Sequence, residues 1–272
     1  MPQVTANGIS LNYDDTGGDG RPVVLIHGWP LSGASWSEQV PAFAEAGHRV
    51  ITYDRRGFGD SDKPGSGHDY DTFAADLAGL LEALDLRDVA LVGFSMGGGE
   101  IARYIGTFGE DRVRAAVFAA AVPPYLLKTD DNPEGGLAPE DVEGMQQGAR
   151  DDREGFLDGF TTDFFSSGGE LKVTEEQRQE ALALEAKAED RALVDCIAAF
   201  GTTDFRADLA KVTVPTLVIH GDGDATVPFE VSGERTARAV AGARLHVVQD
   251  GPHGFNVSHA EEFNREVLAF LA

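Results

Sequence analysis

Cysteine and basic residues are scarce in this chain of 272 residues. The single cysteine, Cys196, cannot form a disulfide within the chain, and its helical-looking surroundings (192–200) favour a small buried side chain over a reactive thiol. Only 22 basic residues face 46 acidic ones, which gives a net charge of −24. Such a charge repels phosphate backbones and anionic lipid, so we expect neither nucleic acid nor a membrane as a partner.

Long hydrophobic runs are also missing. The longest apolar stretches, such as residues 114–122, are far shorter than a membrane span. The first seven residues contain neither the basic nor the apolar region of a signal peptide, so we expect a cytoplasmic protein. No linker rich in Gly, Ser or Pro divides the chain, which predicts one compact domain.

Short apolar runs alternate with segments of helical spacing. The runs typical of strands buried on both faces are residues 23–26, 50–53, 89–92, 115–118 and 216–219. Helical spacing is found over residues 36–46, 72–84 and 100–108. This alternation predicts an α/β fold with a mostly parallel sheet and helices on both faces. Residues 3–6 and 9–13, around Asn7-Gly8, predict an antiparallel hairpin at the edge of the sheet.

The alternation stops between about residues 123 and 205. This stretch is acidic, rich in Gly and Pro at its start, and helical in pattern over 175–188 and 192–200. It separates two strands of one sheet, so we expect it above the carboxyl edge of the sheet, where ligands bind in such folds. The predicted organisation is a first core part (1–123), a helical cap insertion (124–206) and a second core part (207–272).

Ser95 is the candidate nucleophile. It lies in Gly93-Phe94-Ser95-Met96-Gly97, directly after the predicted strand 88–92 and directly before a helical segment. In that context the G-x-S-x-G pattern predicts a tight turn that presents the hydroxyl at the tip of the strand. The alternative is a glycine-rich turn with an idle serine. A phosphate-binding P-loop is excluded because no Gly-Lys-Ser/Thr sequence follows.

His253 is the candidate base among seven histidines, since a serine hydroxyl needs one within hydrogen-bond reach. It lies in a loop between the last predicted strand (244–248) and the last predicted helix (260–271). In hydrolases with the chain order Ser, acid, His, the base occupies this loop. His27 and His220 each close a strand and precede Gly, which suits structural hydrogen bonds beneath the site.

Two aspartates could orient His253, because the strand at 216–219 is followed by His220-Gly221-Asp222-Gly223-Asp224. Asp224 lies further along the turn and has more freedom to reach the histidine. Asp222 is the alternative, although its position favours capping the turn through nearby backbone amides. The carboxylate would fix the histidine tautomer and stabilise the imidazolium without accepting the proton.

An oxyanion needs two donors, for which backbone amides suffice. Met96 follows the nucleophile and supplies one amide. The second is expected from the loop His27-Gly28-Trp29-Pro30, where the amide of Trp29 can face the serine. Pro30 has no N–H to donate.

Several motifs together resemble the cofactor-free bacterial haloperoxidases, a perhydrolase and arylesterase branch of the α/β-hydrolases. The resemblance covers essentially the whole chain and is carried by residues 27–33 (HGWPLSG), 53–61 (YDRRGFGDS), 93–100 (GFSMGGGE), 122–129 (VPPYLLKT) and 251–254 (GPHG). It implies an α/β-hydrolase fold with a mostly parallel eight-stranded sheet and a helical cap. It also assigns Ser95, Asp224 and His253 as the triad, and the amides of Trp29 and Met96 as the oxyanion donors.

The resemblance further implies a chemistry. An ester or a carboxylic acid acylates the serine, and water or hydrogen peroxide releases the acid or the peracid. No metal or other cofactor is required, and relatives often assemble as trimers or dimers, which makes a homo-oligomer an expectation for this chain. In this family Pro30 favours perhydrolysis, and the Asp54-Arg55-Arg56-Gly57 stretch is a structural loop beneath the site, with an anion clamp as its alternative.

Other functions of the same fold remain as alternatives. A dehalogenase or an epoxide hydrolase would need a carboxylate nucleophile in place of Ser95, so the sequence argues against both. A lactonase or a carbon–carbon bond hydrolase could use the same triad. A ligand-binding protein with a relic triad is the remaining alternative outside enzymes.

Overall fold

A computed structural model describes residues 2–272. Its strands are β1 (Gln3–Ala6), β2 (Ile9–Asp15), β3 (Pro22–Ile26), β4 (Arg49–Tyr53), β5 (Val89–Phe94), β6 (Val113–Ala119), β7 (Ser166–Ser167), β8 (Glu170–Leu171), β9 (Thr216–Gly221) and β10 (Arg244–Val248). Its helices are η1 (Gly33–Trp36), α1 (Val40–Glu45), α2 (Tyr70–Ala83), α3 (Met96–Phe108), α4 (Pro139–Asp151), α5 (Arg153–Phe164), α6 (Glu175–Glu185), α7 (Asp190–Thr202), α8 (Arg206–Leu209), α9 (Gly233–Ala239), α10 (Phe255–Ser258) and α11 (Ala260–Leu271).

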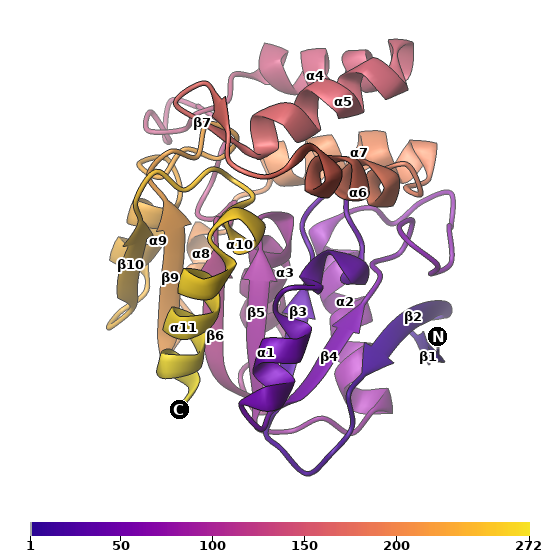
Figure 1. Cartoon of the computed structure of the whole chain (residues 1–272), viewed down its shortest axis with the longest axis vertical. Coiled ribbons are helices and arrows are strands. Elements are labelled where there is room, and N and C mark those ends of the chain that lie inside the picture. Colours follow the sequence, from indigo (N-terminus) through magenta and orange to yellow (C-terminus); the bar gives the residue numbers. More distant parts are fainter. Residues whose placement is uncertain (1) are drawn as a thin grey trace.

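Eight strands form one twisted sheet in the order β1-β2-β4-β3-β5-β6-β9-β10. The hairpin of β1 and β2 is antiparallel and joins β4 in antiparallel register, whereas all later neighbours pair in parallel. Figure 1 shows helices covering both faces of this sheet. The predicted α/β architecture with its N-terminal edge hairpin is therefore confirmed.

The central strand β5 shows why these runs form buried strands. Its side chains alternate between the two faces of the sheet, as the period of two requires. Val89 and Leu91 belong to the apolar cluster that includes α2 and α3, whereas Ala90 and Val92 belong to the cluster that includes α1 and α11. Both faces are covered, so the strand is apolar throughout and fully buried.

Helix boundaries differ from the sequence pattern where local chemistry intervenes. The helix predicted over residues 36–46 is present but shorter, because the structure has η1 up to Trp36 and then α1 over Val40–Glu45. Pro41 lies in the first turn of α1, where its missing N–H costs no hydrogen bond, and it could not lie inside a longer helix. Helix α2 begins at Tyr70, two residues earlier than predicted, because the Asp69 side chain accepts a hydrogen bond from the amide of Thr72 (2.9 Å).

Helices α4, α5, α6 and α7 lie above the carboxyl ends of the strands in Figure 1. Of these, the sequence pattern located α6 and α7 but gave no boundaries for α4 and α5. Their arrangement is that of a cap over the core. Its division at residues 124 and 206 remains our proposal: the second boundary falls at the first residue of the short α8, which packs against α3 of the core.

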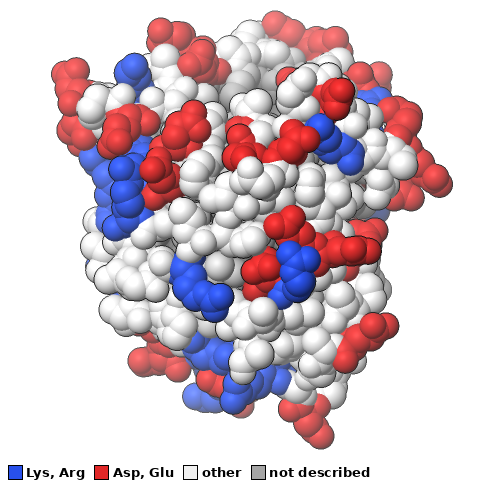
Figure 2. All heavy atoms as spheres, turned by 60° about the vertical axis from the view of Figure 1, so that its left-hand side comes forward, with Lys and Arg blue, Asp and Glu red and all other residues white. Residues whose placement is uncertain are grey.

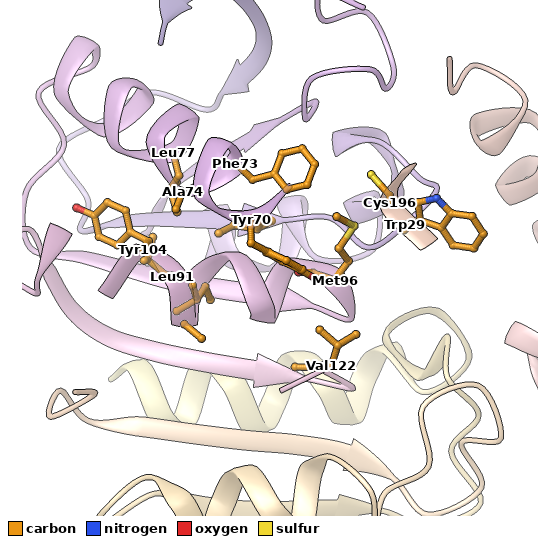
Figure 3. Packing of buried hydrophobic residues seen from close by; sticks show 14 of the residues in the cluster. Trp29, Tyr70, Phe73, Ala74, Leu77, Leu91, Met96, Tyr104, Val122 and Cys196 are labelled. Atoms are coloured by element: carbon orange, nitrogen blue, oxygen red, sulfur yellow. The ribbon is translucent and has the colours of Figure 1, made fainter. Parts of the chain in front are cut away.

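Cys196 is packed inside the apolar core. Figure 3 shows Cys196 among the residues of the larger hydrophobic cluster, to which Trp29 also belongs. The residue is fully buried, and burial raises the pKa of its thiol well above the ordinary range. The predicted small buried side chain is thus confirmed.

The surface reflects the acidic composition. Figure 2 shows acidic side chains gathered toward the cap end of the face drawn, with basic side chains interspersed. Among residues 2–272, no helix combines the length and the apolar character needed to cross a bilayer.

Candidate active site

Ser95 occupies the sharp turn between β5 and α3. Its backbone has φ +53° and ψ −118°, a conformation that L-residues rarely adopt. Glycines on either side make the turn feasible: a Cβ at Gly93 would collide with the backbone of Gly97, and one at Gly97 with the carbonyl of Ile26. The sequence pattern therefore folds into a turn that raises the hydroxyl at the tip of the central strand.

His253 reaches Ser95 from the loop between β10 and α10. Its Nε2 lies 2.9 Å from the Oγ of Ser95, and its Nδ1 lies 2.6 Å from Oδ2 of Asp224. All three side chains are buried. Because a carboxylate can only accept a hydrogen bond, Nδ1 carries the proton and Nε2 is left to accept from the serine hydroxyl. The structure thus brings together the three residues that the sequence singled out.

Asp224 is held by more than the histidine. Its Oδ1 accepts hydrogen bonds from the amides of Thr226 (2.9 Å) and Val227 (2.8 Å), while Nε2 of His220 lies 3.1 Å from its Oδ2. Burial alone would raise the pKa of this carboxyl. Electrostatic attraction to His253 and the hydrogen bonds from both histidines outweigh that effect and lower the pKa to about 2. The group therefore stays ionised at neutral pH.

Asp222 has a different task from the one its spacing suggested. Its Oδ1 accepts a hydrogen bond from the amide of Asp250 (2.6 Å), which lies on the histidine loop, residues 249–254 between β10 and α10. Capping of the local turn falls to Asp224 instead, through the amides of Thr226 and Val227. The expectation that Asp222 caps its own turn is therefore wrong. The cause is the pairing of β9 with β10, which places the histidine loop beside Asp222.

The two predicted oxyanion donors lie beside the serine. A Cβ on Gly28 would stand 3.1 Å from the Cβ of Ser95, which places the loop of Trp29 against the nucleophile. Among residues 2–272, neither the amide of Trp29 nor that of Met96 donates a hydrogen bond, although both residues are buried. Buried amides are rarely left unpaired. Both are therefore free for a ligand oxygen, and their role as oxyanion hole remains a proposal.

The Asp54-Arg55-Arg56 loop is structural, as expected. The guanidinium of Arg55 is buried against Glu100 (2.8 Å), and its backbone amide bonds to Nε2 of His27 (3.0 Å). Arg56 is paired with Asp76 (2.5 Å). Because both arginines are already neutralised, they hold the loop that carries Trp29 and are not free to clamp an anion.

A small, mostly apolar pocket opens onto Ser95 and His253. Its volume is about 40 Å³. The other residues that line it are Trp29, Val122, Leu126, Leu137, Met145, Phe160, Phe200, Thr226 and Val227. At roughly 10–15 Å³ for each water-sized group, this space holds about three heavy atoms, the size of an acetyl group.

The aromatic wall of the pocket was not foreseen from the sequence. The ring centres of Phe160 and Trp29 are 5.0 Å apart. The ring of Phe164 packs edge to face against the imidazole of His253, with 5.1 Å between the ring centres. The signal was nevertheless present, because Phe156, Phe160 and Phe164 recur every four residues, the spacing of one helical face.

Comparison with known proteins agrees with this geometry. A family model described as the alpha/beta hydrolase fold matches residues 21–260. Non-heme chloroperoxidase CPO-A1 of Kitasatospora aureofaciens is 43% identical, and the alignment covers 98% of each chain. The bifunctional esterase/perhydrolase DCH of Acinetobacter calcoaceticus is 37% identical, with 98% of each chain covered. The crystal structure of a bromoperoxidase from Bacillus anthracis superposes with a TM-score of 0.96 at 53% identity, over 99% of both chains.

The fold, the serine turn and the family match together define the class: this chain belongs to the α/β-hydrolase family. Its relatives within that family include a non-heme chloroperoxidase, a bromoperoxidase and an esterase/perhydrolase. The resemblance stated from the sequence motifs is thereby confirmed, and the protein is an enzyme of this class.

Proposed function

We propose that the enzyme hydrolyses short carboxylic esters through an acyl group on Ser95, and that hydrogen peroxide can replace water as the acceptor. One observation carries the proposal: the unbroken chain from the serine Oγ through His253 (2.9 Å) to Asp224 (2.6 Å) at a small apolar pocket. The names of the relatives, chloroperoxidase and esterase/perhydrolase, support it.

Acylation begins when Nε2 of His253 takes the hydroxyl proton as the Oγ of Ser95 attacks the ester carbonyl. The carbonyl oxygen becomes an oxyanion, which the free amides of Trp29 and Met96 stabilise. The imidazolium then gives its proton to the leaving alcohol oxygen. The products of this half-reaction are the acyl-serine and the free alcohol.

Deacylation repeats the same steps with a second nucleophile. Water attack releases the carboxylic acid, whereas hydrogen peroxide attack releases the peracid, and in both cases the serine hydroxyl is restored. A carboxylic acid can also acylate the serine with loss of water, which allows a peracid to form without any ester. Halide oxidation then follows in solution by the released peracid, away from the protein.

The size of the pocket restricts the acyl group. Space for about three heavy atoms beside the nucleophile suits acetyl better than longer chains. Apart from Ser95, His253 and the hydroxyl of Thr226, the lining side chains are apolar, so burial of a charged acyl group here is unfavourable. We therefore propose short aliphatic acids and their esters as substrates.

The proposal is tested by turnover of an aryl acetate, with and without hydrogen peroxide, for the wild type and Ser95→Ala. We expect acetate alone without peroxide, acetate and peracetate with it, and a loss of about 10⁴- to 10⁶-fold in kcat for the variant. A folded variant with near-native turnover contradicts the proposal. Lactones and β-diketones belong in the same panel, because faster turnover of either would favour a lactonase or a carbon–carbon bond hydrolase.

A further inference from the structure

The histidine loop is attached to the cap as well as to the core. Asp250, the second residue after β10, begins this loop in the left-handed region, with φ +57°. Asparagine and aspartate tolerate that conformation better than other non-glycine residues. The amide of Asp250 donates to Oδ1 of Asp222 (2.6 Å), which fixes the core side of the loop next to the acid turn.

The carboxylate of Asp250 faces the opposite way, toward the β7-β8 hairpin of the cap. Its Oδ1 accepts a hydrogen bond from the hydroxyl of Ser167 (2.6 Å), and its Oδ2 lies 2.7 Å from Nζ of Lys172. Hydrogen bonds from Lys172 and Ser167 hold the pKa of this carboxyl below its ordinary value. Figure 1 shows this hairpin over the loops that follow β9 and β10. Ser167 and Lys172 of the cap therefore both bind Asp250 at one end of the histidine loop.

The cap also contacts the other end of the same loop. The amide of Gly254 donates to the carbonyl of Phe164 (2.8 Å) at the end of α5. The ring of Phe164 stands edge to face against the imidazole of His253, 5.1 Å between centres. The histidine loop thus contacts the cap on both sides of His253. Within residues 250–254, the contact made through a charged carboxylate is that of Asp250.

We propose that Asp250 is a positioning residue, which sets the cap against the histidine loop so that His253 meets Ser95 at the productive distance. The inference rests on the proposed function, because it takes His253 as the base. Asp250 touches neither substrate nor the reacting atoms and acts only through the loop. Small misplacements of a catalytic group are costly, by up to about 10²-fold for ~1 Å.

A purely stabilising ion pair would behave differently. The Asp250 side chain is 62% exposed, and such pairs contribute little to stability. The contact should therefore be visible in the rate of reaction and not in the melting temperature. Salt gives a second distinction, because exposed pairs are screened when the Debye length falls to ~3 Å at about 1 M.

The experiment uses two variants that remove the contact from opposite sides. Asp250→Asn keeps a residue that tolerates the left-handed backbone, and Lys172→Met leaves the loop sequence untouched. For each we expect kcat on an aryl acetate to fall about 3- to 10-fold, a fraction of the limit for ~1 Å, with KM nearly unchanged. Phosphonylation of Ser95 by a fluorophosphonate should slow by the same factor. Because both variants remove one contact, their effects should not add in the double variant.

Glu170→Gln is the matched control. Glu170 also lies near Lys172 (3.4 Å) but is not bonded to Asp250, so this variant should react at the native rate. Wild-type kcat in about 1 M sodium chloride should move toward that of Asp250→Asn, and the variant should be insensitive to salt.

Native kcat and native phosphonylation rates in Lys172→Met overturn the proposal, whether or not Asp250→Asn folds. A lowered melting temperature with unchanged kcat overturns it as well, because it reveals a stabilising contact only. Failure of the proposed function is a separate result, since it would show as retained turnover in Ser95→Ala.

Discussion

His220 and His253 share one carboxylate oxygen, Oδ2 of Asp224, at 3.1 Å and 2.6 Å. His220 lies at the end of β9, and its Nε2 is also 2.8 Å from the carbonyl oxygen of Val227. It therefore stabilises the turn that contains Asp224. The other oxygen is occupied by two backbone amides. Asp224 is thereby fixed in one orientation, which fixes the imidazole of His253 in turn.

Replacing Asp224 with Asn should abolish most activity. The amide can present an N–H to Nδ1 and thus favour the wrong tautomer of His253, as in other triads, where the loss in kcat is about 10⁴-fold. Steady-state kinetics on an aryl acetate measure it. Asp222→Asn is the matched control, because an amide oxygen can still accept from the Asp250 amide. Equal losses in the two variants would show that the acid has been wrongly assigned.

Acyl-chain preference should follow the volume of the pocket. Phe160→Ala removes a ring from the wall and should raise kcat/KM for a hexanoyl ester, relative to the acetyl ester, by about 10-fold or more, since each added methylene gains ~0.8 kcal/mol on burial. Phe156→Ala is the control, because its ring also packs on Trp29 (6.2 Å) but does not line the pocket. An unchanged preference in Phe160→Ala would mean that acyl groups bind elsewhere.

Glu185 predicts a pH dependence of stability within the cap. Its Oε2 lies 2.6 Å from the hydroxyl of Thr161, which is equally close to the carbonyl of Leu157. The hydroxyl has one proton, so a protonated Glu185 satisfies both contacts. Burial raises the pKa of Glu185 to about 8 from an ordinary 4.5, against the opposing effects of Thr161 and Arg178.

Between pH 4.5 and about pH 8, Glu185 is therefore protonated in the folded state and ionised in the unfolded chain. The stabilising contribution is complete below pH 4.5 and is lost as the pH rises to about 8. Glu185→Gln should remove this pH dependence. Near pH 9 its free energy of unfolding should exceed that of the wild type by about 2 to 4 kcal/mol. Denaturant unfolding at pH 5 and pH 9 measures it, with the exposed Glu180→Gln on the same helix as control. A gain that is equal at both pH values would contradict a protonated Glu185.

The sequence could single out the three candidate residues because each follows a predicted strand, although only the strands before Ser95 and Asp224 are clear apolar runs. Ser95, Asp224 and His253 come after β5, β9 and β10, and parallel strands bring their carboxyl ends to one edge. The division of labour between Asp222 and Asp224 could not be derived from a spacing of two residues. It depends on which loop lies opposite each side chain, and strand pairing decides that only in three dimensions.

The cap was predictable as an insertion but not in detail. Helix α4 is polar overall, and α5 uses its aromatic residues to line the site and contact His253. The spacing of Phe156, Phe160 and Phe164 indicates one helical face of α5, but the spacing alone does not tell whether that face meets the core or a ligand pocket. The contacts of Asp250 were invisible for a similar reason, since they join segments about 80 residues apart.

The most direct test of the account is mass spectrometry of the enzyme quenched during turnover of an aryl acetate. We expect a single acetyl group on the peptide that contains Ser95, its disappearance in Ser95→Ala, and its accumulation in His253→Ala to be too slow to detect. An acetyl group on another residue, or full turnover with no acylated serine at any time, would contradict the acyl-enzyme mechanism.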